Sequence, residues 1–150
     1  MGISIQAKIN KIAKKVGVVL SPRDPHDSYL WNGKNVGVGG LSASNQLHEI
    51  GHWLVASPAM RMENDFGLGP GPESGLDVLV KEDDSMQCEE LASLVGIAYE
   101  AYIGMPYEKT LMDHAWIGGG CEKEDCESFW KCIQTLQEMG LLDGHLPVTR

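Results

Sequence analysis

His48 and His52 stand four positions apart in the segment His48-Glu49-Ile50-Gly51-His52. In an α-helix this spacing places the two side chains one above the other, so both imidazole rings can reach one metal ion at about 2.0–2.1 Å. Glu49 lies roughly 100° around the helix from His48, where it can reach a water bound to the ion more easily than the ion itself. The segment therefore requires a helix with one open side and predicts a metal site that activates water, with Glu49 as the base.

The apolar residues near the two histidines predict which side of this helix is buried. Leu47, Ile50 and Leu54 lie roughly 100–160° away from His48 on a helical wheel. The apolar side can then pack on a core while the histidines face a cleft. This arrangement favours a functional role for the histidines over a buried structural one.

A second helix is predicted from Met86 to about Ile103. One of its sides carries a glutamate followed by small residues at helical spacing: Glu89, Ala92, Ser93 and Gly96. Small side chains allow another helix to approach closely.

A tetrahedral catalytic zinc needs a third protein ligand and an open position for water, and a glutamate from such a helix completes a His₂Glu set. We predict Glu89 as this ligand, because it heads the small-residue stripe. Glu90, about 100° further round, is the alternative. The aspartates of the irregular sequence before this helix are less favoured as ligands, namely Asp77, Asp83 and Asp84.

Two further elements are predicted before the histidines. Apolar residues at helical spacing indicate an N-terminal helix over residues 3–16. Asn32-Gly33 lies between two short β-prone runs and favours a two-residue turn, which predicts a hairpin over about 28–39 and a small antiparallel sheet. With the helices, this sheet predicts the α+β class.

Two segments after the histidines complete the predicted architecture. Residues 56–84 are rich in glycine and proline, and we expect an irregular stretch that either borders a substrate cleft or is an inert insertion. A C-terminal helix is predicted over about 122–139. Its apolar side is expected to pack on the core or to bind a partner, and it carries Phe129, Trp130, Ile133 and Leu136.

Composition limits the classes of protein that fit this chain. Its 150 residues, 43% of them hydrophobic and 22% charged, are typical of one globular domain over 1–150. The formal net charge of −9 argues against direct binding of nucleic acid, because neutralising phosphates needs clustered lysines and arginines. No apolar run approaches the roughly 20 residues of a membrane span, and the N-terminus lacks a secretory signal. We therefore expect a cytoplasmic protein with no membrane partner, and four cysteines that stay reduced.

The motifs together resemble a known family. The run HEIGHW from His48, followed by Glu89-Glu90-Leu91-Ala92, is similar to the gluzincin arrangement of an HExxH helix and a downstream glutamate helix. With Asn32-Gly33 before the first motif and Ser93 after the second, the chain resembles the ImmA/IrrE-like family of small intracellular zinc metallopeptidases. The resemblance covers roughly residues 28–103.

The resemblance implies a minimal zincin-like domain with zinc on His48, His52 and Glu89, and Glu49 as general base. It implies hydrolysis of a peptide bond in a protein substrate, since phage and mobile-element members of the family cleave repressor-type regulators. Ser93 departs from the family, which usually has Asn or Asp at this position to orient a ligating histidine. A hydroxyl is a shorter and weaker partner for a ring N–H.

Several roles remain open from sequence. A donor near the metal would stabilise the oxyanion of the reaction, and His114, Tyr102 or Tyr107 could serve. The alternative function is a catalytically inactive interaction module with a structural zinc, closed by a fourth protein ligand such as Cys88. The oligomeric state and the bond cleaved are not determined by these motifs.

Overall fold

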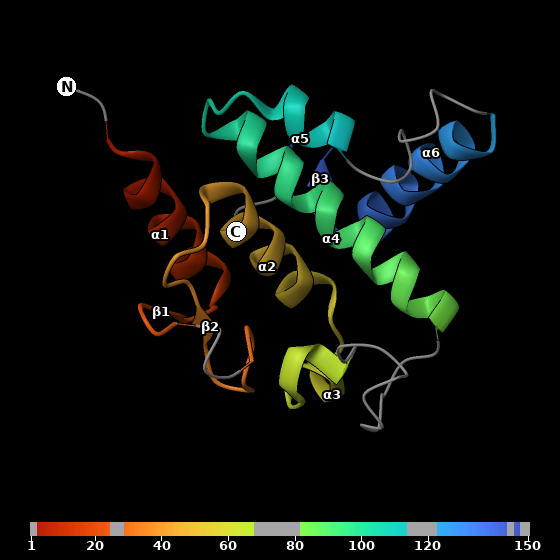
Figure 1. Cartoon of the computed structure of the whole chain (residues 1–150). Helices are drawn as coiled ribbons and strands as arrows, with labels where there is room; N and C mark the ends of the chain where they lie inside the picture. Colours follow the sequence, from red (N-terminus) through yellow and green to blue (C-terminus); the bar gives the residue numbers. More distant parts are fainter. Residues whose placement is uncertain (1–2, 25–28, 68–81, 114–122, 144–145, 148–150) are drawn as a thin grey trace.

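The computed structural model describes residues 3–24, 29–67, 82–113, 123–143 and 146–147. Over these residues the fold is α+β and mostly helical, as predicted (Figure 1). In chain order the elements are α1 Ile5–Val16, β1 Leu20–Ser21, β2 Val36–Gly37, α2 Ala43–Val55, α3 Pro58–Arg61, the 3₁₀ helix η2 Asn64–Gly67, α4 Glu82–Tyr102, α5 Tyr107–Asp113, α6 Lys123–Glu138, β3 Leu142–Asp143 and β4 Leu146–Pro147.

Helix α1 lies within the predicted range of 3–16, and local capping sets both of its ends. Ser4 Oγ accepts a hydrogen bond from the Ala7 N–H, so the helix begins at Ile5. Gly17 adopts the left-handed conformation at φ 97° and donates its N–H to the Ala13 carbonyl, which ends the helix.

The predicted antiparallel sheet at residues 28–39 is wrong. The two-stranded sheet there is parallel and pairs β1 with β2, with Leu20 opposite Val36. Trp31 and Val36 form only an isolated antiparallel bridge. Strand β1 is the partner of the strand that contains Val36, since the Val36 N–H donates to the Val19 carbonyl at 2.9 Å. An antiparallel pair does occur at the end of the chain, between β3 and β4.

The turn at Asn32-Gly33 also differs from the predicted two-residue turn. Asn32 Oδ1 accepts hydrogen bonds from the N–H groups of Lys34 and Asn35, at 3.0 and 2.9 Å. This side-chain acceptor stabilises a four-residue loop between Trp31 and Val36, with Gly33 at φ 86°.

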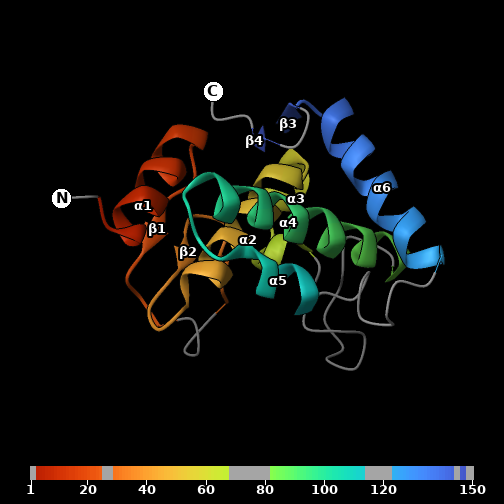
Figure 2. The same cartoon turned by 90° about the horizontal axis from the view of Figure 1, so that it is seen from above.

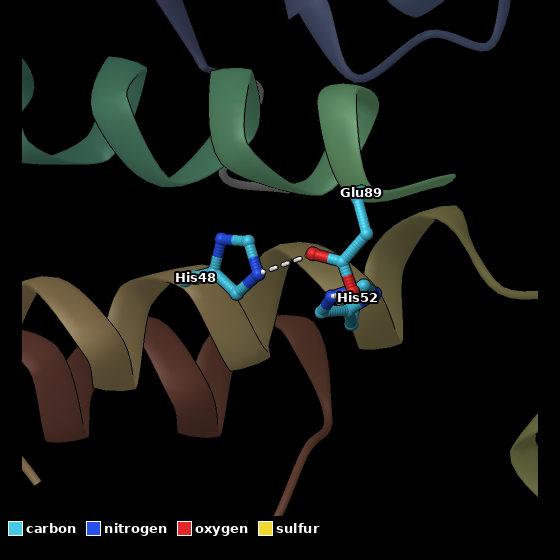
Figure 3. Close-up of side chains that lie close together, drawn as sticks. All are labelled: His48, His52 and Glu89. Atoms are coloured by element: carbon cyan, nitrogen blue, oxygen red, sulfur yellow. Dashed lines mark hydrogen bonds and ion pairs between the residues drawn. The ribbon is translucent and has the colours of Figure 1, made fainter. Parts of the chain in front are cut away.

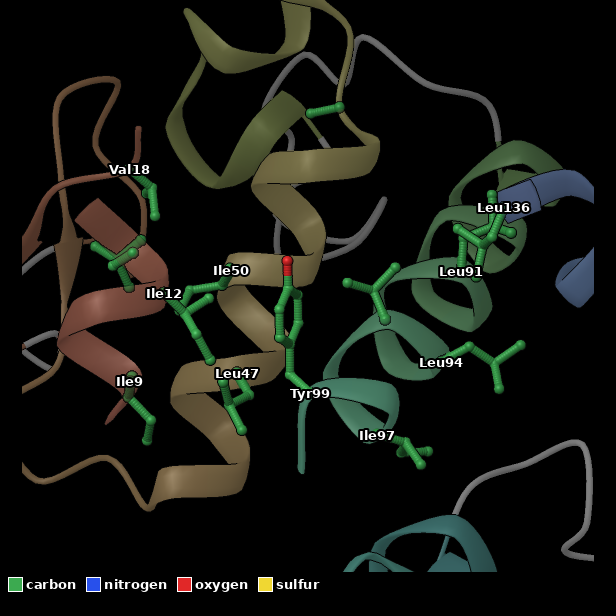
Figure 4. Packing of buried hydrophobic residues seen from close by; sticks show 14 of the residues in the cluster. Ile9, Ile12, Val18, Leu47, Ile50, Leu91, Leu94, Ile97, Tyr99 and Leu136 are labelled. Atoms are coloured by element: carbon green, nitrogen blue, oxygen red, sulfur yellow. The ribbon is translucent and has the colours of Figure 1, made fainter. Parts of the chain in front are cut away.

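Helices α2 and α4 pack side by side and in opposite directions at the centre of the fold, and α1 lies on the far side of α2 (Figures 1 and 2). The core fills the spaces between these three helices (Figure 4). Leu47 and Ile50, from the predicted apolar side of α2, are fully buried, and Leu54 is half-buried. The same side carries Gln46, whose amide forms reciprocal hydrogen bonds with that of Gln6 on α1.

The small-residue stripe of α4 lies against α2, as its side chains predict. A Cβ added to Gly51 would clash with the backbone carbonyl of Ala92. A Cβ added to Gly96 would lie 3.1 Å from the backbone nitrogen of His48. Two glycines, one on each helix, therefore allow the two backbones to approach closely.

The described structure also corrects several details. Helices α3 and η2 occupy the first part of the predicted irregular stretch 56–84. Helix α4 begins at Glu82, so Asp83 and Asp84 lie in its first turn, whereas Asp77 lies outside the described residues. None of the described helices is long and apolar enough to cross a membrane.

Helix α6 agrees with its predicted range, but its packed face does not. Trp130 is 67% exposed, whereas Leu136 is fully buried and Ile133 is half-buried. Cys132 is buried, and its Sγ donates to Glu90 Oε2 of α4 at 3.3 Å. The side chain of Phe129 lies outside the described set.

Candidate metal centre

The three residues predicted as metal ligands lie together between α2 and α4 (Figure 3). His48 Nε2 is 3.1 Å from Glu89 Oε2, and His52 Nε2 is 3.1 Å from Glu89 Oε1. The histidines come from successive turns of α2, and their ring centroids are 4.7 Å apart. One carboxylate from α4 thus faces both rings.

The spacing of these atoms fits a small divalent cation. Two ligand atoms bound at about 2.0–2.1 Å with tetrahedral angles lie about 3.3 Å apart. Each observed separation of 3.1 Å, which joins one histidine to a different oxygen of Glu89, is close to this value. One ligand atom from each residue lies within 4.8 Å of the others. Two imidazoles and a carboxylate are the donors of a catalytic rather than a closed structural zinc site. The group could therefore bind a metal ion.

The alternative ligands lie elsewhere. Glu90 accepts the hydrogen bond from Cys132 of α6, so its carboxylate is turned away from the two histidines. Cys88 is half-buried and does not belong to the metal-ligand group found among the described residues. Within the described part of the chain, the arrangement is therefore His48, His52 and Glu89.

Opposed effects of burial and charge set the protonation of the cluster. Burial alone would lower the pKa of His52, but the hydrogen bond and negative charge of Glu89 raise it above its ordinary value. Burial alone would raise the pKa of Glu89, but hydrogen bonds to His48 and His52 hold it far below its usual range. Glu89 therefore stays ionised, as a metal ligand must be.

Glu49 has an environment different from that of Glu89. Burial raises the pKa of its carboxyl, and the nearby His52 and His48 only partly oppose this effect. A carboxyl with a raised pKa accepts a proton more readily than an ordinary glutamate does, which suits a general base. Two neighbouring glutamates thus have pKa values that are shifted in opposite directions.

Ser93 lies where the resemblance places a residue that orients a histidine. Its buried Oγ is 3.1 Å from His48 Nδ1. If Nε2 of His48 binds a metal, the ring proton is on Nδ1, which then donates to Ser93 Oγ. The shorter serine side chain reaches the ring because α2 and α4 are in close contact at Gly96.

A stack of aromatic rings holds His52, and sequence reasoning missed it. The His52 ring stacks on Phe66 at 5.8 Å, and Phe66 stacks on Trp31 at 5.1 Å. Phe66 and Asp65 of η2 have positive φ values of 59° and 47°, which is unusual for residues other than glycine. No periodicity in the sequence marks these two residues.

Hydrogen bonds fix η2 to the loop that carries Trp31. Asp65 Oδ1 accepts from the Trp31 N–H at 3.3 Å, and the Asp65 N–H donates to the Trp31 carbonyl at 2.8 Å. The Trp31 indole also donates to the Arg61 carbonyl at 2.8 Å. The loop after α2 therefore returns to cover His52.

Of the three candidates for stabilising an oxyanion, the structure describes the two tyrosines, and it places neither of them in the metal-ligand group. Tyr102 is 55% exposed and borders a cavity together with lysines of α1. Tyr107 is half-buried and packs against the hydrophobic core. His114 lies outside the described residues, as do His26 and His145.

A comparison with protein families, curated proteins and solved structures finds no match for this chain.

Proposed function

We propose that this protein is a zinc-dependent metallopeptidase that hydrolyses a peptide bond in a protein substrate. The observation that carries the proposal is the convergence of His48 and His52 on Glu89, each at 3.1 Å, beside the half-buried Glu49, whose pKa is raised. The resemblance to the ImmA/IrrE-like family supports the same reaction and suggests a repressor-type regulator as substrate.

The roles of the residues follow from their chemistry. His48, His52 and Glu89 would hold the ion, with Ser93 fixing the orientation of the His48 ring. A zinc ion held there supplies a Lewis acid for the scissile carbonyl and lowers the pKa of a water from near 16 to about 7.

Glu49 provides the proton transfers. Its carboxylate accepts a proton from the attacking water, and the new C–O bond forms at the scissile carbon. The same carboxyl then donates that proton to the leaving nitrogen as the C–N bond breaks. The raised pKa of Glu49 favours the first of these steps, because the group accepts a proton more readily than an ordinary glutamate does.

Metal analysis and proteolysis of matched variants test the proposal. We expect the wild-type protein to bind close to one zinc and to cleave peptides in a random library. Glu49→Gln should retain zinc and lose about 10²–10⁴-fold in rate, because it removes the general base. Glu89→Gln should lose zinc, whereas Glu90→Gln, which changes the adjacent residue, should retain it.

Two outcomes would contradict the proposal. If zinc does not bind and His48→Ala changes no property, there is no metal centre. If zinc binds but wild-type and Glu49→Gln proteins are equally inactive, the inactive-module function is favoured instead. Glu49 argues against that alternative, since a structural zinc site has no use for a base beside the cluster.

A further inference from the structure

A cavity of about 250 Å³ adjoins the metal centre on the side of His48. Its walls come from α2, α4 and α5 and include Ser44, His48, Ser93, Glu100 and Thr110. A single water occupies about 30 Å³ of liquid, and sites for drug-sized ligands are about 300–1,000 Å³. The cavity therefore has the size for one long side chain.

A buried carboxyl group lies in this cavity. Glu100 is 2% exposed, and its Oε1 accepts hydrogen bonds from Ser44 Oγ at 2.7 Å and from Thr110 Oγ1 at 2.9 Å. Both donors use the same oxygen. Among the described residues, no hydrogen bond to Oε2 is found, although a buried acceptor without a partner is costly.

The spacing along both helices places this carboxyl further along the groove between α2 and α4, in the cavity that His48 also lines. Glu100 follows Glu89 by eleven residues, so it lies on the same side of α4 about 16 Å further along the axis. Ser44 precedes His48 by one turn of α2, which is about 6 Å. The hydroxyl of Ser44 bridges from α2 to Glu100, and the cavity thus extends away from His48 along the groove between the two helices.

The charge of the cavity selects its occupant. Glu100 is the one acidic side chain among the described residues that line the cavity. The whole chain carries a formal net charge of −9. Hydrogen bonds between a cation and a carboxylate are roughly twice as strong as those between neutral groups, and an ammonium or guanidinium would satisfy Oε2. An acidic side chain would be repelled.

We propose that this cavity is a specificity subsite for a lysine or arginine side chain of the protein substrate, with Glu100 as the residue that binds its charge. This subsite rests on the proposed peptidase function, since it would select the residue near the bond cleaved at the adjacent metal centre. Ser44 and Thr110 act as positioning residues, because they hold Oε1 and leave Oε2 directed to the ligand.

The test has a cleavage arm and a binding arm. In the first, zinc-loaded wild-type protein digests a random peptide library, and cleavage sites are mapped by mass spectrometry. We expect Lys and Arg to be enriched at one position beside the cleaved bond. Glu100→Gln should reduce kcat/KM for such peptides by about 10–100-fold, the effect of one lost charged hydrogen bond. Its zinc content should not change.

The second arm uses butylguanidinium as the probe and pentanamide as its neutral counterpart. Amide NMR signals of Ser44 and Thr110 should shift with butylguanidinium and not with pentanamide, and the affinity should fall about tenfold or more in Glu100→Gln. Glutamine retains an oxygen that can accept from both hydroxyls, so the fold should persist. Glu108→Gln, an exposed site on α5 with the same change in charge, is the matched control and should behave as wild type.

The possible outcomes distinguish failure of the subsite proposal from failure of the peptidase proposal. Cleavage by the wild-type protein without a preference for Lys or Arg overturns the subsite and leaves the peptidase. A preference that persists in Glu100→Gln also overturns it. If no library peptide is cleaved and Glu49→Gln behaves identically, the peptidase proposal fails, and butylguanidinium binding alone decides whether Glu100 binds cations. The preference of the wild-type protein can be read without any variant.

Discussion

His48 is held at both nitrogens of its ring, by Glu89 at Nε2 and by Ser93 at Nδ1. A serine hydroxyl is a weaker acceptor than the amide or carboxylate expected at this position from the resemblance. It is nevertheless buried and within hydrogen-bond distance. Each candidate histidine therefore has its own support, since His52 is fixed instead by the Phe66 ring.

Removing the Ser93 hydroxyl should weaken metal binding. In Ser93→Ala the Nδ1–H of a metal-bound His48 would lose its acceptor, and loss of a partner that orients a metal ligand costs about 10–100-fold in affinity. We expect about a tenfold loss, measured by competition with a chromophoric zinc chelator. Thr135→Ala, which removes a hydroxyl that bonds within α6, is the control and should bind zinc normally. Equal affinity of Ser93→Ala and wild type would show that Ser93 does not support His48.

At the scale of elements, the closeness of α2 and α4 determines the geometry of the metal centre. The ligands come from two helices, so their separation depends on the distance between the helix backbones. Gly51 faces the Ala92 backbone, and Gly96 faces the backbone of His48. A side chain at either glycine would separate Glu89 from the histidines.

Gly51→Ala should therefore be destabilising. In an exposed helix this change stabilises by about 1 kcal/mol, because alanine is the better helix former. Here the added Cβ meets the carbonyl of Ala92, and overpacking of this kind costs about 1–3 kcal/mol. Urea unfolding should show a lower free energy of unfolding, and chelator competition should show weaker zinc binding.

A matched substitution on the same helix separates packing from helix propensity. Asn45 is exposed on α2, so Asn45→Ala should slightly increase stability and leave zinc affinity unchanged. If Gly51→Ala were as stable as Asn45→Ala, the two helices would not need the glycine for close approach.

At the scale of the whole molecule, two buried groups make the free energy of unfolding depend on pH in the alkaline range. Burial and the neighbouring Tyr102 raise the pKa of Tyr99 to about 12 from 10.0. Burial and the hydrogen bond to Glu90 raise the pKa of Cys132 to about 12 from 9.0. Both groups are neutral when protonated, so the fold disfavours their charged forms.

The free energy of unfolding should therefore fall as the pH rises from about 9 to 12. The folded pKa values lie above the unfolded ones, so their stabilising contribution is complete below pH 9 and is lost as the pH approaches 12. In this window the unfolded chain binds fewer protons, and each such group contributes a slope of about −1.4 kcal/mol per pH unit. Urea unfolding at several pH values measures the slope, and Tyr99→Phe should reduce it above pH 10.

The exposed neighbour provides the control. Tyr102 is 55% exposed, so Tyr102→Phe should change the slope less than Tyr99→Phe does. A free energy of unfolding that stays constant from pH 9 to 12 would contradict burial of these two groups.

The amino-acid sequence was sufficient where the physical cause is local. Helical spacing relates His48 to His52 and aligns Glu89 with Ala92, Ser93 and Gly96, because a helix has the same period wherever it forms. The α+β class, the buried side of α2 and the close approach of α4 follow from the same regularity. Capping by Ser4 and Gly17 is local too.

The predictions from sequence were wrong where groups distant in the chain compete for the same backbone hydrogen bonds. The hairpin was expected from Asn32-Gly33 and the β-prone runs beside it. Instead, β1 pairs with the strand that contains Val36, and the Arg23 guanidinium binds the carbonyls of Tyr29 and Leu30. Tyr102 was a candidate for stabilising the oxyanion, but it is exposed at the end of α4 and borders a cavity with lysines of α1. Helical periodicity does not specify where the neighbouring elements end.

The sequence by itself determined which side chains could form the cluster, because their spacing is a property of single helices. Only the tertiary structure decided what surrounds it. The ring of Phe66 reaches His52 through an irregular loop with positive φ values, and Ser44 and Thr110 meet Glu100 across separations of 56 and 10 residues. Such contacts depend on how the helices pack, and no local pattern of residues encodes them.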